Sequence, residues 1–113
     1  MKIPFGQVKA KLPLPATNRW PEGVWDIEAF KHGSMSVVLF APQGRDYQDV
    51  HRQDELYIVL SGSGTLVLDE SRGSFSQGDV LFVPAGKHHH FESSTPDFVT
   101  WAIFWGGAVG GEK

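Results

Sequence analysis

The chain has 113 residues, 41% of them hydrophobic, and a formal net charge of −3, which suits one domain with a single core. The mild charge and the lack of any lysine or arginine run argue against a nucleic-acid partner. The absence of cysteine excludes disulfides, thiolate metal sites and cysteine nucleophiles. Because no stretch resembles a signal peptide or a membrane span, we expect a cytoplasmic protein with no membrane partner.

Residues 1–23 form a proline-rich N-terminal segment. Proline lacks an amide donor and therefore disfavours regular hydrogen-bonded structure. The segment also carries apolar side chains that an ordered chain could bury, including Ile3, Leu12 and Trp20. We expect an extended arm that wraps the domain or packs on a partner subunit, with a disordered tail as the alternative.

Residues 24–106 have the pattern of short β-strands. Runs rich in Val, Ile, Leu, Phe, Tyr and Trp alternate with turn residues at short, regular intervals. No window combines a 3.6-residue apolar period with helix caps. The pattern predicts an all-β sandwich or barrel, followed by a flexible tail over residues 107–113. The expected strands lie within residues 23–30, 34–41, 55–60, 64–70, 80–84, 88–93 and 97–105.

The first group of candidate ligands lies in the sequence DVHRQDELYIVL, just before and within an expected strand. Asp49 and His51 are two residues apart and would share one face of a strand. Glu55 lies four residues after His51, which is about 13 Å along a straight strand. A bend at residues 52–54 would instead let His51 end one strand and Glu55 open the next. Both side chains could then point into one cavity.

The second group is the triplet His88, His89 and His90, which opens an expected strand. Imidazole is both the commonest metal ligand and the commonest general base. Strand alternation places His89 on one face together with Phe91, and places His88 and His90 on the other. No single face of the strand can therefore present all three imidazoles to one site.

With these residues in view, the chain resembles a small single-domain cupin. The first cupin motif, H-x-H-x3-4-E-x6-G after an earlier glycine, is matched by His51, Glu55 and Gly62, with Gly44 upstream. The second motif, G-x5-P-x-G-x2-H-x3-N, is matched by Gly78, Pro84, Gly86 and His89. Two positions depart from the motifs: Asp49 stands where the first histidine is expected, and Ser93 stands in place of the final asparagine.

The resemblance implies an antiparallel double-stranded β-helix, that is, a jelly-roll β-barrel with a metal ion in its mouth. The implied ligands are His51, Glu55 and His89, and Asp49 could supply a fourth, oxygen ligand. Such a donor set suits Fe, Mn, Ni or Zn. Tyr57 shares the strand face of Glu55. The further candidates for the pocket lining are Gln53, Tyr57, Phe91 and Trp101, although Tyr57 could equally be an ordinary core aromatic and core packing is favoured for Trp101.

The expected function is a metal-binding cupin with a small-molecule pocket. The metal would serve as a Lewis acid or redox centre for oxygenase, isomerase or decarboxylase chemistry on a small organic substrate. The alternative is a noncatalytic binding or sensing module, because fold alone does not decide function. Small cupins commonly dimerise, so the resemblance also implies a homodimer. The proline-rich arm and the strand over residues 97–105 could provide its interface.

Overall fold

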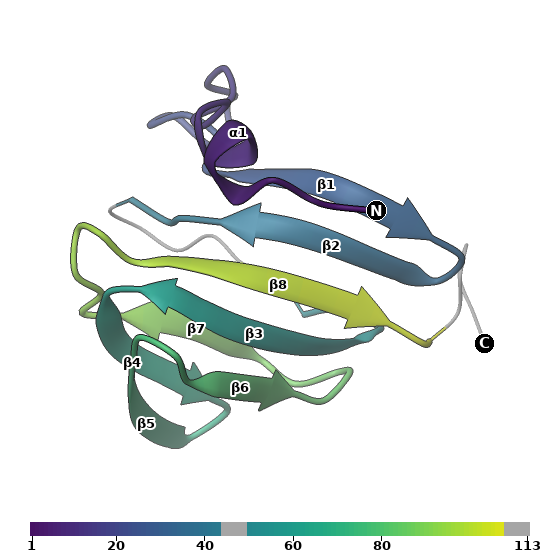
Figure 1. The fold of residues 1–113 in the computed structure, drawn as a ribbon. Coiled ribbons are helices and arrows are strands. Elements are labelled where there is room, and N and C mark those ends of the chain that lie inside the picture. The colour runs from purple at the N-terminus through teal and green to yellow at the C-terminus, as the bar shows by residue number, and fades with distance from the viewer. Residues whose placement is uncertain (44–49, 108–113) are drawn as a thin grey trace.

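Figure 1 shows the chain as two layers of antiparallel strands with one short helix beside them. The computed structural model describes residues 1–43 and 50–107. The all-β prediction is confirmed, because strands make up nearly all of the regular structure in these residues. The elements are α1 (Phe5–Lys9), β1 (Asp26–His32), β2 (Met35–Phe40), β3 (Asp54–Ser61), β4 (Ser63–Leu68), β5 (Ser71–Ser76), β6 (Val80–Val83), β7 (His89–Glu92) and β8 (Val99–Trp105).

The strands form a five-stranded sheet, in the order β1-β2-β8-β3-β6, and a three-stranded sheet, in the order β5-β4-β7. Every pairing is antiparallel. The last strand along the chain, β8, lies between β2 and β3, so the C-terminal strand completes the middle of the larger sheet (Figure 1). The chain therefore crosses between the two layers after β3, β5, β6 and β7.

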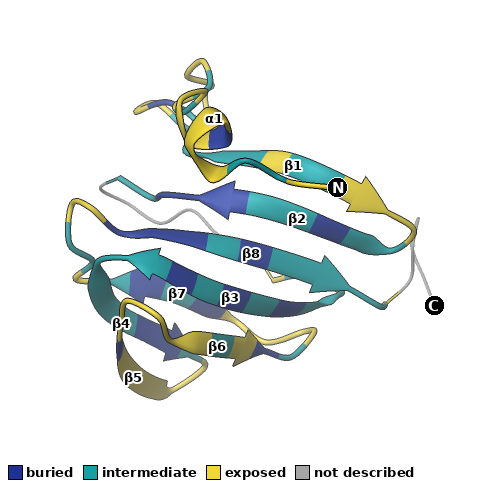
Figure 2. Ribbon diagram, in the orientation of Figure 1, coloured by how far each residue is buried: buried dark blue, intermediate teal, exposed yellow. Residues whose placement is uncertain are grey.

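The main core fills the space between the two sheets. Strand β3 supplies it through alternation, because Glu55, Tyr57 and Val59 are buried while the residues between them are half-buried (Figure 2). Successive residues of a β-strand point to opposite faces of the sheet, so burial alternates with a period of two residues. The core consists mainly of apolar and aromatic side chains: Phe40, Tyr57, Val59, Leu66, Phe75, Val83, Phe91, Phe98 and Ala102.

The turn between β3 and β4 explains the glycine that ends the first motif. Gly62 has a φ of +83°, a conformation that residues with a Cβ rarely adopt. A Cβ at this position would lie 2.6 Å from the Cα of Phe98. The turn is therefore packed directly against the segment that leads into β8, and only glycine fits there.

The N-terminal segment packs on the outer face of the five-stranded sheet. Val8, Leu39, Ala41 and Val99 form a second buried cluster, to which Ile3 and other apolar residues of the segment add. The segment is not fully extended as expected, because residues Phe5–Lys9 form the helix α1. One helical turn buries Val8 against the sheet while its polar residues stay exposed. The predicted boundaries of arm, barrel and tail stay predictions, and residues 108–113 of the tail lie outside the described range.

In the described residues, no helix is long and apolar enough to cross a membrane. The expected cytoplasmic location stays a prediction.

Candidate metal site

The structure brings His51, Glu55 and His89 together, although 38 positions of sequence numbering separate the first from the last. Glu55 is on β3, His89 opens β7, and His51 lies in the segment just before β3. Each residue offers one ligand atom, and the three atoms lie within 4.8 Å of one another. We call this group the His–Glu–His cluster. The bend at residues 52–54 that the sequence suggested is what brings His51 back toward Glu55.

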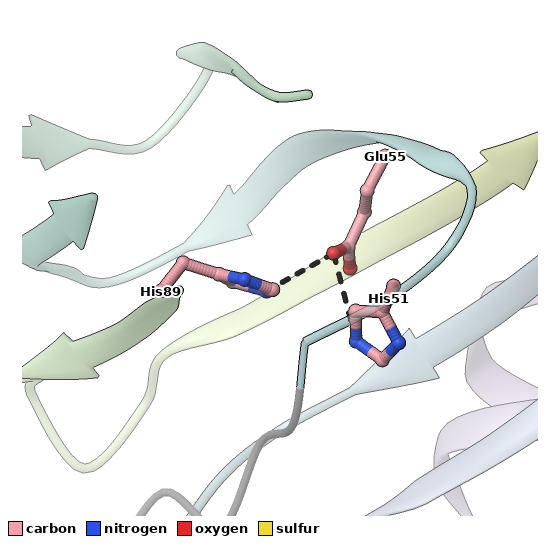
Figure 3. Close-up of side chains that lie close together, drawn as sticks. All are labelled: His51, Glu55 and His89. Atoms are coloured by element: carbon pink, nitrogen blue, oxygen red, sulfur yellow. Dashed lines mark ion pairs between the residues drawn. The ribbon is translucent and has the colours of Figure 1, made fainter. Parts of the chain in front are cut away.

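Glu55 stands between the two imidazoles (Figure 3). Its Oε1 atom lies 3.1 Å from Nε2 of His89 and 3.9 Å from Nε2 of His51. The side chains of Glu55 and His89 are essentially inaccessible to solvent, whereas the side chain of His51 is 33% exposed. Nε2 of His51 is also inaccessible to solvent, so the His51 side chain reaches the surface through the rest of its ring.

The carboxylate of Glu55 indicates that the cluster fits a cation. Both of its oxygens are buried and make no hydrogen bond to any residue that the structure describes. An uncompensated buried carboxylate is costly, so such groups are normally paired or coordinate a metal. Two ligand atoms bound to one metal at about 2.1 Å and near a right angle lie about 3 Å apart, which agrees with the 3.1 Å between Glu55 and His89. The His–Glu–His cluster could therefore hold a metal ion.

Backbone contacts fix the position of His51. The amide of Gly86 donates to the carbonyl oxygen of His51 at 2.8 Å, and the amide of Ala85 donates to Oδ1 of Asp54 at 2.9 Å. These bonds hold the segment before β3 against the turn between β6 and β7. That turn carries the Pro-x-Gly part of the second motif, so the motif glycine positions a residue of the first motif.

The imidazole of His89 is held from both of its nitrogens. Nδ1 lies 3.3 Å from the carbonyl oxygen of Lys87, and Nε2 lies 3.2 Å from the hydroxyl of Tyr57. Tyr57 is fully buried two residues after Glu55 on β3, which places its hydroxyl beside the cluster. Tyr57 lies on the same face of β3 as Glu55, as strand parity predicted.

The alternation predicted for the histidine triplet is also observed. His89 is buried and pairs with Leu68 in the sheet, with its side chain toward the cluster. His90 is on the other face, where its side chain is 44% exposed and its Nε2 contacts Glu92 at 2.7 Å. His88 lies just before β7 and is exposed.

The other proposed pocket residues have varied surroundings. Gln53 directs its amide away from the cluster, donating to the carbonyl oxygens of Ser34 at 2.7 Å and Gly106 at 3.1 Å. These bonds tie the segment before β3 to the β1–β2 turn and to the end of β8. A pocket role for Gln53 stays a prediction.

Phe91 and Trp101 lie in the two apolar clusters. Phe91 is buried between the sheets, with its ring centroid 4.9 Å from those of both Tyr57 and Phe98. Trp101 is on the outer face of β8, in the cluster formed with the N-terminal segment, where its ring meets Phe5 edge-on at 6.3 Å. The structure therefore places Trp101 on the opposite side of the sheet from the His–Glu–His cluster.

A phenylalanine that the sequence reading passed over borders the cluster. The ring of Phe104 meets that of His51 at 4.9 Å and 70°. Phe104 pairs directly with Glu55 across β8 and β3, so the two residues share a face. Alternation along the strand over residues 97–105 places Phe104 on the face opposite Trp101, and this is the signal in the sequence that could have identified it. Asp49, the proposed fourth ligand, lies outside the described residues.

Comparison with known proteins decides the family. Residues 36–105 match the family model of the cupin domain, and this match includes most of β2, all of β8 and the whole cluster. The chain belongs to the cupin family. The predicted jelly-roll architecture and the resemblance are thereby confirmed.

Several known cupins and cupin-like folds are similar to this chain. SCO3923, an uncharacterized protein of Streptomyces coelicolor, is 31% identical over 80 residues, which cover 69% of this chain and 76% of that protein. The crystal structure of a Cupin 2 conserved barrel domain protein from Salinispora arenicola has a TM-score of 0.62 and 23% identity over 74% of this chain and 76% of that one. A Ralstonia eutropha protein proposed to be a mannose-6-phosphate isomerase has a TM-score of 0.58 and 22% identity over 87% and 94% of the two chains. At these identities the structural likenesses concern the fold.

Proposed function

We propose that this cupin binds a divalent metal ion through His51, Glu55 and His89 and holds a small organic ligand next to it. The observation that carries the proposal is the buried carboxylate of Glu55, which faces two imidazoles and has no hydrogen bond within the described residues. Imidazole and carboxylate donors suit Fe, Mn, Ni or Zn. The identity of the metal is left to experiment, and Asp49 is retained as a candidate fourth ligand.

The charge of the proposed site favours an anionic or oxygen-rich ligand. Two neutral imidazoles and the Glu55 carboxylate around a divalent ion leave one positive charge, since +2 and −1 give +1, and Asp49 as a fourth ligand would make the site neutral. A bound metal would supply a Lewis acid or a redox centre. The exposed side of His51 provides the approach for the ligand, and the ring of Phe104 excludes water beside it. We therefore propose an oxygenase or isomerase acting on a small organic substrate.

A noncatalytic binding or sensing role is the second candidate, and the packing of the barrel favours it. The rings of Phe40, Phe75, Phe91 and Phe98 fill the interior below Tyr57, with centroid separations between 4.9 and 5.9 Å. Little depth is then left for a substrate on the barrel side of the cluster. Turnover separates the two roles: consumption of O2 or conversion of a small oxygenated acid by the metal-loaded protein would support an enzyme.

Metal analysis tests the ligand set directly. After incubation of the untagged protein with Fe, Mn, Ni or Zn and removal of free metal, we expect close to one metal per chain by elemental analysis. His51→Ala and His89→Ala should each abolish stable binding, because each removes one of three ligands. His90→Ala is the matched control, since it removes a neighbouring imidazole on the opposite face of β7. Metal content that is negligible in the unaltered protein, or that is lost only in the His90 variant, would contradict the proposal.

We also propose that the protein is a homodimer joined through the outer face of the five-stranded sheet. The N-terminal segment covers only the part of this face near Leu39 and Trp101. The rest is apolar, and its edge strand β6 is largely exposed (Figure 2), with Val80 at 59% and Phe82 at 50%. Cross-strand pairing puts these side chains on one face. We call this surface the apolar outer face; it comprises Leu56, Ile58, Val80, Phe82, Ile103 and Trp105.

A second copy of the chain is the partner that this face fits. None of its six side chains is charged, and Asp54, which shares this face opposite Trp105, accepts a hydrogen bond from the amide of Ala85 at 2.9 Å. Two sheets that pack face to face through apolar side chains lie about 10 Å apart. In a dimer with two-fold symmetry, the same surface of each subunit contacts its copy on the other subunit. Large exposed apolar patches of this kind mark interfaces.

A further inference from the structure

An open cavity lies between the N-terminal segment and the larger sheet, apart from the His–Glu–His cluster. Its volume is about 580 Å³, within the range of about 300–1,000 Å³ that is typical of small-molecule sites. Its lining includes α1, which lies over the end of the sheet where β1 begins and β2 ends (Figure 1). None of the lining residues belongs to the His–Glu–His cluster or to the apolar outer face. The cavity is therefore a separate candidate for ligand binding.

The bottom of the cavity is apolar. Phe98 and Val99, where β8 begins, and Ala41, which follows β2, line it and are almost completely buried. The half-buried side chains of Leu12 and Trp25 add apolar surface. An apolar group that enters the cavity removes this surface and its own surface from water, which is favourable. The cavity therefore suits a ligand with an apolar or aromatic group.

Two polar side chains of the cavity hold the loop between β7 and β8 in place. The hydroxyl of Ser61 donates to the carbonyl oxygen of Asp97 at 2.5 Å, and Nε2 of Gln43 donates to the carbonyl oxygen of Pro96 at 3.3 Å. All four residues line the cavity. These bonds use the donors of Ser61 and Gln43, while the amide oxygen of Gln43 stays an acceptor. They also fix the backbone that carries the Asp97 carboxylate.

One cation and one anion border the cavity. Lys9 lines it from α1, and Asp97 lines it from the loop before β8. Both side chains are exposed, and neither forms an ion pair with any residue that the structure describes. The polar groups left for a ligand are therefore an ammonium, which attracts a carboxylate, and two acceptors, the Asp97 carboxylate and the Gln43 amide oxygen, which attract an ammonium.

We propose that this cavity binds a free α-amino acid with an apolar or aromatic side chain. Lys9 pairs with the carboxylate of the ligand, Asp97 and the amide oxygen of Gln43 accept from its ammonium group, and its side chain packs on the apolar bottom. A fatty acid would use Lys9 alone, and an aromatic amine would use Asp97 alone, whereas a zwitterion uses both. The site needs no metal and goes beyond the proposed function.

Titration with L-phenylalanine, followed by amide NMR, tests the site. We expect saturable binding that shifts the amide signals of Ala10, Ala41 and Val99, which line the cavity. Phenethylamine lacks the carboxylate and 3-phenylpropionate lacks the ammonium group, so each should bind at least about fivefold more weakly. L-Alanine keeps both charges but lacks the ring, so it should bind at least about tenfold more weakly. Equal affinity for L-phenylalanine and either singly charged probe would overturn the proposal, as would the absence of saturable L-phenylalanine binding at millimolar concentrations.

Two charge variants assign the roles of Lys9 and Asp97. Lys9→Gln should weaken the binding of L-phenylalanine and 3-phenylpropionate by about fivefold and leave that of phenethylamine unchanged. Asp97→Asn should weaken L-phenylalanine and phenethylamine and leave 3-phenylpropionate unchanged. A structural defect would weaken all three probes alike, which would contradict the assigned roles. Lys11→Gln is the matched control, because Lys11 is exposed beside α1 and does not line the cavity.

A larger side chain at Gly6 tests the cavity itself. Gly6 lines the cavity, and a Cβ built on it would meet no atom within 4 Å. Gly6→Leu should therefore fill the cavity and abolish L-phenylalanine binding without lowering the melting temperature, since leucine favours a helix more than glycine does. Unchanged binding in a folded Gly6→Leu variant would overturn the proposed location, and the two charge variants decide the matter if this variant does not fold. His89→Ala should bind L-phenylalanine as tightly as the unaltered protein, which separates this site from the proposed metal site.

Discussion

Asp26, at the start of β1, is a carboxylate in an unfavourable position. It pairs with Phe40 across β1 and β2, so its side chain lies on the face of the sheet that borders the main core. Burial raises the pKa of the Asp26 carboxyl above its ordinary value. Between the unfolded and folded pKa values, the folded protein binds more protons than the unfolded chain. Stability therefore falls as the pH rises through that window.

Asp26→Asn should remove the loss of folding stability that accompanies ionisation of the buried Asp26 carboxyl. We expect a higher melting temperature than that of the unaltered protein at pH 7. Because the side chain keeps partial contact with water, the gain in the free energy of unfolding should stay below about 1 kcal/mol. The difference should disappear in acid, where Asp26 is already protonated. Thermal denaturation from pH 3 to 8 measures it. Glu28→Gln, at an exposed position on the same strand, is the control, and an equal gain in that variant would contradict the assignment to Asp26.

Single residues also show where sequence reasoning reaches its limit. Strand parity and motif spacing were sufficient to select His89 from the triplet and to place it with Glu55. The contacts of Gln53 were not predictable, because its amide bonds to carbonyl oxygens of residues 19 and 53 positions away. The same holds for the tie between Gly86 and His51. Local patterns indicate which face a side chain occupies, whereas the partner it meets depends on how distant turns pack together.

At the scale of elements, strands rich in apolar residues were predictable, including the largely exposed β6, and the mostly polar β5 was not. The strands of the larger sheet carry apolar residues on one or both faces, which gives a strong signal. Strand β5 was missed because it has Phe75 as its single buried residue among five exposed, mostly small or polar ones. It forms through pairing with β4 rather than through its own propensity. The helix α1 has five residues, too few to display a helical period.

The outer face of the three-stranded sheet carries a charged cluster that links β5 and β7. Glu92 forms an ion pair with Arg72 and contacts Nε2 of His90 at 2.7 Å. The hydrogen bond from His90, followed by that from Arg72, lowers the pKa of the Glu92 carboxyl below its ordinary value. A lowered folded pKa contributes stability that is present above the unfolded pKa and is lost as the pH falls through the folded pKa.

Glu92→Gln should therefore destabilise the protein at neutral pH and have a diminishing effect in acid. The loss at neutral pH should be small, since the pair is exposed and screened by solvent. Melting temperatures of the variant and the unaltered protein, compared from pH 3 to 8 at low and high salt, check both trends. Glu70→Gln makes the same charge change in the exposed turn after β4. A pH-independent difference for Glu92→Gln would show that the ion pair does not contribute as described.

At the scale of the whole molecule, the two faces of the larger sheet have separate tasks. Its inner face contributes Glu55 and Tyr57 to the candidate site. Its outer side is covered in part by the N-terminal segment, and the remainder includes the residues of the apolar outer face. The two functions share strands but not side chains, because neighbouring residues of one strand point in opposite directions. Glu55 and Leu56 are an example, since one belongs to the cluster and the other to the proposed interface. Changes to the interface should therefore leave the metal ligands in place.

Phe82→Glu tests the dimer without removing a core residue. Phe82 is half-exposed on the edge strand β6, where its ring lies 6.2 Å from that of Trp105. A glutamate there would place two like charges near each other across a two-fold interface and bury them without partners. We expect the unaltered protein to sediment as a dimer at micromolar concentration and the variant to sediment as a monomer that still binds metal. Ser74→Glu, on an exposed strand of the smaller sheet, should remain dimeric. A monomeric unaltered protein, or a dimeric Phe82→Glu variant, would show that the apolar outer face does not join two copies.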